Sequence, residues 1–252
     1  MQECTIMCGR FVSPDEAAIE RHWHIGRHNW NSFIVPVFNV APTMQVPIIL
    51  LAPDGVIELA GARWGLIPGW WKKPVPPSLT FNARSEEAAE KPTWRQSLKT
   101  MRCLMPACGW YEWNENERVR AESGRQANQP YFIHAPGEEV VAFAAMWSIW
   151  QRPDAEPVLS CALLTKEAAP SISNIHRRMP VVLAPEQYSA WLTSTTMPQE
   201  VGELIAESRQ DFEGYRVSTK VNNVRNNFPE LLEKVEQHTT RTDQELKEQG
   251  SK

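Results

Sequence analysis

The chain of 252 residues is 42% hydrophobic and 22% charged, a balance typical of soluble globular proteins. Its formal net charge of -4 excludes a global attraction to nucleic acid, so any such binding needs a local basic groove. No apolar run reaches membrane-spanning length, and the N-terminus lacks the features of a secretory signal. Five cysteines, an odd number in a chain this long, indicate free thiols in a cytoplasmic setting without a membrane.

In the first half of the chain, turn signals and apolar alternation predict short elements. Ser13 followed by Pro14 predicts a capped helix that runs to about His24. The elements expected after it are an extended segment at 36–42, strands at 46–51 and 56–64, an irregular loop at 65–77, helices at 85–89 and 93–98, and a strand at 103–113.

The second half opens with a polar segment at 114–129, which we interpret as a long hairpin loop. Strands are expected at 131–134, 140–150 and 158–165, and helices at 185–192 and 199–207. From Glu233 onward the sequence is almost wholly polar and predicts a disordered tail. No repeat or linker divides the body, so the sequence predicts one domain of mixed α and β structure.

Glu112 is the most informative polar residue, because Tyr111 and Trp113 flank it at the end of a strand. Apolar neighbours would raise the pKa of its carboxyl group into a range useful for acid–base chemistry. A Glu that faces solvent on an edge strand fits the local sequence equally well.

The other polar candidates each have a simpler alternative when taken alone. Cys8 fits a buried core thiol, and His176 fits a hydrogen-bonding loop histidine. Asn82 and Arg84 fit caps of the helix that follows them.

Three histidines, His22, His24 and His28, place two imidazoles at i and i+4 spacing. The sequence shows no carboxylate or cysteine placed to complete a zinc site with them. We therefore expect no metal and no cofactor.

Seven short motifs occur together and in order along the chain. They are Met7-Cys8-Gly9-Arg10-Phe11, Asn39-Val40-Ala41-Pro42, Trp64-Gly65-Leu66-Ile67-Pro68, Asn82-Ala83-Arg84-Ser85-Glu86, the stretch from Cys103 to Trp113, His176-Arg177-Arg178-Met179-Pro180, and the stretch from Val217 to Leu231. Together they resemble the SOS response-associated peptidase family, also called abasic-site processing proteins. The resemblance covers about residues 7–232.

The resemblance implies a single α+β domain with a mixed, mostly antiparallel β-sheet or barrel core and flanking helices. It divides the chain into a leader at 1–7, a catalytic domain at 8–232 and a polar tail at 233–252. The implied partner is single-stranded DNA that contains abasic sites, and we expect the protein to act as a monomer. The implied activities are self-cleavage as a peptidase and covalent crosslinking to DNA with lyase-type chemistry.

The chemistry of an abasic site explains why an N-terminal cysteine suits it. The opened sugar carries an aldehyde, and an N-terminal cysteine offers an α-amine and a thiol that close a five-membered thiazolidine on one carbonyl carbon. The α-amine has an unperturbed pKa of about 8, so a useful fraction is neutral at neutral pH. An internal cysteine has no such amine.

The resemblance also implies a role for each site residue. Cys8 forms the imine and the thiazolidine, Glu112 moves protons, His176 assists sugar opening, and Asn82 orients Cys8. The implied DNA contacts are Arg10, Asn39, Trp70, Trp71, Arg84 and Arg178, with phosphates bound by arginine and bases stacked on tryptophan. For one of the two tryptophans, a hydrophobic loop anchor is an equally good interpretation.

This sequence departs from the family pattern at its start, because six residues precede Met7 where the family usually begins Met-Cys. Either translation begins at Met7 or the chain cleaves itself before Cys8. Two rival functions stay open: a cysteine peptidase that acts on itself or on other proteins, and a non-covalent binding module for single-stranded or modified DNA.

Overall fold

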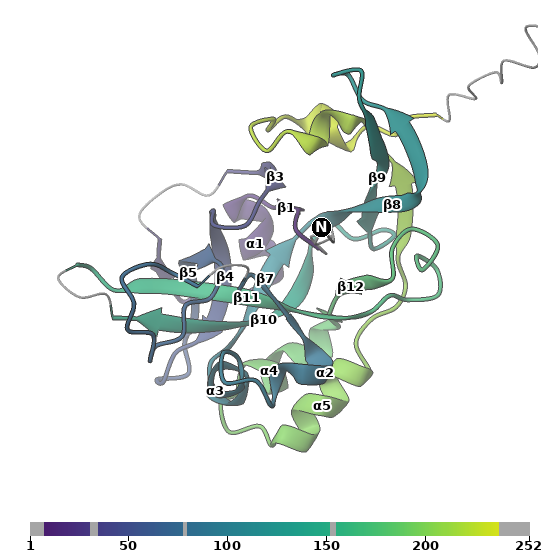
Figure 1. The fold of residues 1–252 in the computed structure, drawn as a ribbon. Helices are drawn as coiled ribbons and strands as arrows, with labels where there is room; N and C mark the ends of the chain where they lie inside the picture. The colour runs from purple at the N-terminus through teal and green to yellow at the C-terminus, as the bar shows by residue number, and fades with distance from the viewer. Residues whose placement is uncertain (1–7, 31–34, 78–79, 152–154, 237–252) are drawn as a thin grey trace, which may run out of the picture.

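The computed structural model describes residues 8–30, 35–77, 80–151 and 155–236 (Figure 1). Its centre is a barrel in which neighbouring strands pair in the order β11-β10-β7-β4-β5. The ring closes because β5 also pairs in parallel with β11, through Ser160 with Arg63 and Cys161 with Trp64. The five strands are β4 (Gln45–Leu51), β5 (Ile57–Trp64), β7 (Arg102–Ala107), β10 (Val141–Trp150) and β11 (Val158–Glu167).

Both faces of the barrel wall are buried, which is why its strands are apolar almost throughout. In β4, Val46 and Ile48 belong to the cluster inside the barrel, whereas Ile49 belongs to a second cluster on the outside. Trp64 lies in the inner cluster and is fully buried. Successive side chains of a strand point to opposite faces, so each wall strand serves two cores.

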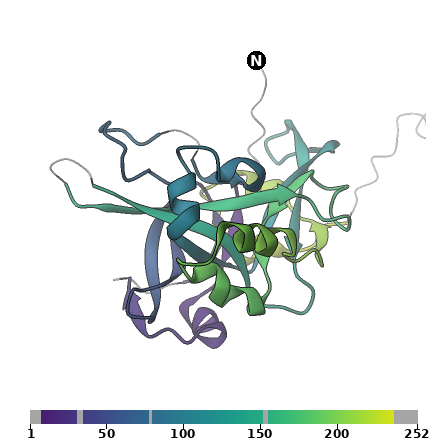
Figure 2. The ribbon, with the colours of Figure 1, turned by 90° about the horizontal axis from the view of Figure 1, so that it is seen from below.

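Helices cover the second apolar cluster, which lies on the outside of the barrel. Trp191 binds the barrel wall directly, since its indole Nε1 donates to the Cys103 carbonyl at 2.9 Å. The helices α2 to α5 gather on one side of the barrel (Figures 1 and 2). In chain order, the helical elements as far as α5 are α1 (Glu16–His22), α2 (Ser85–Ala88), α3 (Arg95–Thr100), η1 (Pro185–Gln187), α4 (Tyr188–Leu192) and α5 (Pro198–Ala206).

A second, antiparallel sheet carries the order β14-β9-β8-β1-β3. Its strands are β1 (Phe11–Ser13), β3 (Val37–Val40), β8 (Gly109–Arg120), β9 (Gln126–His134) and β14 (Glu213–Arg216). The 3-10 turns η2 (Thr219–Asn222) and η3 (Pro229–Leu232) follow β14. Val221 and Leu231 from these turns pack with Val12, Tyr111 and Val217 in a third apolar cluster.

Short strands extend the barrel sheet. They are β2 (Arg27–Asn29), β6 (Asn82–Arg84), β12 (Arg178–Pro180) and β13 (Val182–Leu183). Two of them, β6 and β12, pair with the C-terminal half of β11, at Leu163 to Thr165 and at Thr165 to Glu167 respectively. One strand of the barrel therefore positions two separate chain segments.

The expected α+β domain with a mostly antiparallel sheet or barrel core is confirmed, but three local predictions are wrong. The strand predicted at 103–113 is two strands, β7 and β8, which belong to different sheets. Gly109 lies at the break, where an added Cβ would approach the Ile133 carbonyl oxygen to 2.4 Å. The chain can turn here only because the backbones of Gly109 and Ile133 approach closely. No local sequence pattern indicates that approach.

The hairpin loop predicted at 114–129 is instead a two-stranded ribbon, with a register shift between Asn114 and Arg118 and a short turn after Arg120. Its residues are polar because the ribbon extends into solvent on both faces, as pairs such as Arg118 with Asn128 illustrate. The predicted N-terminal helix is present, but Asp15 caps it: its carboxylate accepts from the Ala18 N–H at 2.7 Å. Ser13 belongs to β1.

At the C-terminal end, the structure describes residues 233–236 of the predicted tail. Val235 still donates its N–H to the Arg216 carbonyl at 2.9 Å, and the rest of the predicted tail, 237–252, lies outside the described residues. The predicted leader at 1–7 also lies outside them. Among the helices that the structure describes, none has the length and apolar character needed to cross a membrane.

Candidate active site

Cys8 lies three residues before the start of β1, and the pairing of β1 with β8 brings it to Glu112. In that pairing Phe11 faces Trp110, and the Tyr111 N–H donates to the Arg10 carbonyl at 3.0 Å. Cys8 has a φ of 46°, in the left-handed region that β-strands never use. The backbone N–H of Cys8 donates to Glu112 Oε1 at 3.0 Å.

Glu112 sits in β8 with 1% of its surface exposed. Burial raises the pKa of its carboxyl group to about 8, although the hydrogen bonds from Cys8 partly offset the rise. Near neutral pH the group therefore carries a proton much of the time and can both give and accept one. The sequence-based expectation of a raised pKa at this glutamate is confirmed.

His176 faces the other oxygen of the same carboxyl group, with its Nδ1 3.7 Å from Glu112 Oε2. The same nitrogen lies 3.0 Å from the Arg178 carbonyl oxygen, a contact that orients the ring. Burial lowers the pKa of His176, so the imidazole is neutral at pH 7. A buried carboxylic acid and a neutral imidazole thus form a pair suited to proton transfer.

Asn82 completes the group from a third direction. Its Nδ2 donates to the Cys8 carbonyl at 3.2 Å, and its strand β6 is held in place by β11. The four residues that the sequence nominated as catalytic, Cys8, Asn82, Glu112 and His176, are therefore brought together by segments distant in sequence.

The Cys8 thiol is buried, and burial together with the nearby Glu112 raises its pKa well above its ordinary value, whereas the charge of Arg178 lowers it. Arg178 is itself fixed by Glu86, whose Oε2 accepts from Nη2 at 2.9 Å, and by the Thr165 carbonyl at 2.7 Å. Sequence reasoning missed Glu86, although it belongs to the Asn82-to-Glu86 motif. Its contact with Arg178 appears only when β6 and β12 meet on β11.

Arg10 and Asn39, two predicted DNA contacts, lie together in a joint with the C-terminal turns. Arg10 Nη1 donates to Asn39 Oδ1 at 3.0 Å and to the Val221 carbonyl at 2.8 Å. Asn39 is 1% exposed, and its Nδ2 donates to the carbonyls of Val221, Asn223 and Asn226 at 3.2, 3.1 and 3.0 Å. In the described structure, this amide anchors residues 221–226 to β3.

The two tryptophans of the 65–77 loop differ in their surroundings. Trp70 is 52% exposed, whereas Trp71 donates its Nε1 to the Val75 carbonyl at 2.8 Å and accepts from Trp150 Nε1 at 2.9 Å through its own carbonyl. Trp71 thus anchors the loop and Trp70 presents its ring to solvent. Arg84, two residues beyond Asn82, has an exposed side chain 3.9 Å from Glu87.

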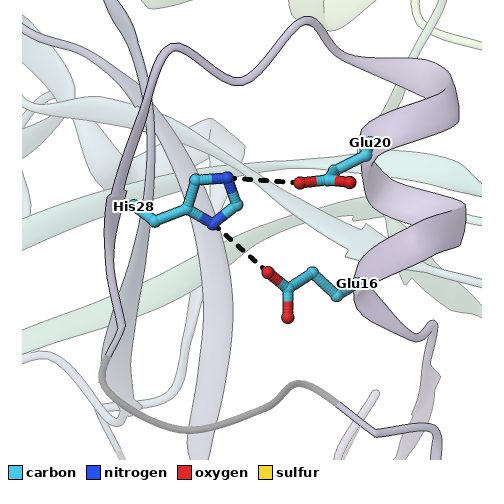
Figure 3. A group of neighbouring side chains, drawn as sticks. All are labelled: Glu16, Glu20 and His28. Carbon is cyan, nitrogen blue, oxygen red and sulfur yellow. Dashed lines mark ion pairs between the residues drawn. The ribbon is translucent and has the colours of Figure 1, made fainter.

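The expectation that no carboxylate accompanies the histidines of the first segment is wrong. His28 lies between two carboxylates of α1, with Nδ1 3.4 Å from Glu16 Oε1 and Nε2 3.3 Å from Glu20 Oε1 (Figure 3). The i and i+4 spacing of Glu16 and Glu20 on a helix was the signal for this group. The two ring nitrogens face different carboxylates, which is the geometry of a bridging ion pair.

A closed barrel joined to a second sheet, with a cysteine, a carboxyl group, an imidazole and an amide converging at the seam, defines an α+β protein with a cysteine-centred candidate active site. The chain belongs to the family described as SOS response associated peptidase (SRAP), whose model matches residues 7–224.

Two relatives of known name support the assignment to this family. The abasic site processing protein YoqW of Bacillus subtilis is 34% identical over 232 residues, which cover 90% of this chain and 99% of that protein. The abasic site processing protein HMCES of Xenopus tropicalis is 30% identical over 268 residues, covering 90% of this chain and 78% of that protein.

Solved structures share the fold. A protein from Bacteroides thetaiotaomicron superposes with a TM-score of 0.75 at 22% identity, over 91% of this chain and all of that one. A phage-related protein from Bordetella bronchiseptica gives a TM-score of 0.61 at 27% identity over 83% of this chain and 94% of that one.

Proposed function

We propose that this protein processes abasic sites in single-stranded DNA by forming a thiazolidine between the opened sugar and Cys8 as the N-terminal residue. The observation that most directly supports this proposal is the 3.0 Å contact between the Cys8 nitrogen and Glu112 Oε1. In a chain that begins at Cys8, this nitrogen is the α-amine, so the nucleophile already lies against a proton-transfer group. The names of the relatives as abasic site processing proteins support the substrate class.

The first step joins the amine to the aldehyde carbon. The neutral α-amine attacks, and a proton moves from nitrogen to oxygen to give a carbinolamine. Glu112 then donates its proton to the hydroxyl group, which leaves as water, and a protonated imine remains. Burial raises the pKa of Glu112 and so favours the protonated form that this donation requires.

The second step closes the ring. Glu112, now a carboxylate, takes the proton of the Cys8 thiol, and the sulfur adds to the imine carbon to give a neutral thiazolidine. Aldehyde and aminothiol thus become thiazolidine and one water, and Glu112 ends as it began. The thiol needs this base because its own pKa is raised by burial.

His176 and Asn82 prepare the reactants in this scheme. The neutral imidazole of His176 accepts the C1 hydroxyl proton of the closed sugar as the bond from C1 to the ring oxygen breaks. The imidazolium then returns that proton to the ring oxygen, so the products are the aldehyde, a free hydroxyl group and neutral His176. Asn82 holds the Cys8 carbonyl and so fixes the direction of the amine and the thiol. Arg10, Trp70, Trp71, Arg84 and Arg178 stay proposed DNA contacts. Asn39, also expected to contact DNA, is 1% exposed, so its proposed role is to hold Arg10 and residues 221–226 in place.

The proposal requires removal of residues 1–7. Intact-mass spectrometry of the purified protein distinguishes the two routes. If the chain cleaves itself, Glu112→Gln and Cys8→Ser retain the leader and the wild type loses it. If translation starts at Met7, all three proteins lack the leader.

Crosslinking tests the function itself. Protein with a verified N-terminal Cys8 is incubated with a single-stranded oligonucleotide that carries one abasic site, and the products are separated under denaturing conditions. The expected result is an adduct that Cys8→Ala abolishes and that the matched control Cys108→Ala retains. Absence of an adduct with correctly processed wild-type protein contradicts the proposal.

The rival peptidase function has less support in the geometry. Hydrolysis by a thiol needs a thiolate, and the Cys8 thiol has a raised pKa, while the His176 Nδ1 faces Glu112. We therefore limit any peptidase activity in the proposal to removal of the protein's own leader.

A further inference from the structure

Three adjoining depressions surround helix α3 and begin at Trp70. One, of about 310 Å³, lies between Trp70 and Ile149, and a second, of about 420 Å³, lies between Trp70 and Arg95. The third, of about 360 Å³, continues past Lys99 toward the start of α5. Gln96 lines all three, so they form one continuous feature, which we call the α3 groove.

The groove is tied to the candidate active site through the loop that carries Trp70. At the base of this loop, the Leu66 N–H donates to the Thr80 carbonyl and Trp64 Nε1 donates to the Phe81 carbonyl, both at 2.9 Å. The next residue, Asn82, contacts Cys8. The segment that carries Trp70 is thus anchored beside the segment that carries Asn82.

The charged residues that line the groove are all cationic. They are Arg95, Lys99 and Arg102, and no Asp or Glu is among the described lining residues. Arg95 and Lys99 are exposed and lie on one face of α3, about 6 Å apart along its axis. In a chain with a net charge of -4, this is a local basic track of the kind that nucleic-acid binding requires.

Arg102 contributes a fixed charge. It is 2% exposed, and its guanidinium donates to the carbonyls of Trp191, Leu98 and Lys99 at 2.7, 2.8 and 2.6 Å. Glu200, in the first turn of α5, acts electrostatically on Arg102 and marks the far end of the cationic stretch.

Apolar surface alternates with these cations. The side chains of Trp70 and Ile149 are 52% and 50% exposed, which is unusual for residues of this size and matches a surface on which bases stack. An exposed aromatic ring followed by cations is the combination used by proteins that bind single strands without sequence preference.

We propose that the α3 groove binds the single-stranded DNA that flanks the abasic site on one side, with a base on Trp70 and Ile149 and phosphates at Arg95 and Lys99. This inference rests on the proposed function, and it adds a specific track for the undamaged part of the strand.

The test uses reversible binding of the full chain to fluorescent thymidine oligomers that carry a stable tetrahydrofuran analogue of the abasic site. The oligomers are lengthened by two to four nucleotides on the 5′ side or on the 3′ side. We expect extension on one side only to tighten binding by the wild type. Arg95→Glu combined with Lys99→Glu is expected to remove that gain and to lower the salt slope by about 1.4, since each single-strand phosphate contact contributes about 0.7.

Arg21→Glu is the matched control, because Arg21 is an exposed cation on α1 paired with Glu139. It is expected to keep the gain from extension. Retention of the whole gain by the Arg95 and Lys99 double variant overturns the proposal. So does equally effective competition by poly-glutamate of matched charge, which would identify the groove as a site for acidic peptides.

The outcome is separable from that of the proposed function. The double variant is expected to crosslink a short abasic oligonucleotide, too short to reach the groove, at the wild-type rate. If no protein crosslinks any abasic DNA, the proposed function fails. If crosslinking proceeds and only the extension effect is insensitive to the double variant, the groove proposal alone fails.

Discussion

Substitution of Glu112 by Gln is expected to stabilise the protein at neutral pH while it removes the acid. Glutamine has nearly the same shape, and its Oε1 can still accept the Cys8 N–H. What it removes is the cost of ionising a carboxyl group in an apolar environment. In the folded protein that cost raises the pKa from 4.5 to about 8.

The sign follows from proton linkage. The folded state binds the Glu112 proton more tightly than the unfolded state, so stability is fully present below pH 4.5 and is lost as the pH rises toward 8. The loss is about 1.4 kcal/mol per pH unit within that window. Between pH 5 and pH 7 the wild type should therefore lose on the order of 2.5 kcal/mol relative to Glu112→Gln.

The assay is urea unfolding of both proteins at several pH values from 4.5 to 9. Both proteins are prepared with the same N-terminus, verified by intact mass, so that all other titrating groups are shared and only the difference between the two curves matters. Glu90→Gln, at an exposed position, serves as the control and should follow the wild type. A difference between wild type and Glu112→Gln that does not change with pH would refute the buried, proton-bearing state of Glu112.

Three further expectations follow from the same geometry. The crosslinking rate should rise with pH as the α-amine loses its proton and fall again at higher pH as Glu112 ionises; rate measurements across pH, on proteins with a verified N-terminal Cys8, should show that Glu112→Gln loses the alkaline fall. Asn39→Ala should cost about 2–4 kcal/mol in urea unfolding, because three carbonyls of residues 221–226 lose their donor, and limited proteolysis should cut that segment first. Gly109→Ala should cost ~2 kcal/mol or more in thermal or urea unfolding, because the added Cβ meets a backbone oxygen at 2.4 Å that has no room to retreat; an unchanged stability would show that the corner is soft.

Sequence patterns predicted the barrel strands well for a physical reason. Strands such as β10 and β11 are buried on both faces, so they appear as apolar runs bounded by turn residues. The ribbon at 114–129 escaped prediction because neither of its faces is buried along most of its length. Backbone hydrogen bonds hold its two strands together. Such bonds leave no hydrophobic pattern in the side chains from which the strands could be predicted.

The sequence likewise predicted some features of the candidate site and not others. The raised pKa of Glu112 was predicted from the sequence, but its flanking residues Tyr111 and Trp113 belong to the cluster on the other face of β8. The burial that raises this pKa comes from segments distant in the sequence. The contacts of Asn82 with Cys8 and of Arg178 with Glu86 depend on which strands pair with β11, and Asn39 depends on where residues 221–226 return. These are long-range placements that a single sequence does not encode in any one segment.

The residues of the candidate site come from both sheets, and each sheet contributes a different kind of group. Cys8 and Glu112 belong to the sheet of β1 and β8, whereas Asn82 and Arg178 belong to the barrel sheet. A small slide of one sheet over the other would change the 3.2 Å contact of Asn82 with Cys8 and the 3.7 Å approach of His176 to Glu112, and would leave the 3.0 Å pair of Cys8 and Glu112 intact. The reacting pair therefore depends on the pairing within one sheet, whereas its orienting groups depend on how the second sheet packs against the first in their shared apolar cluster.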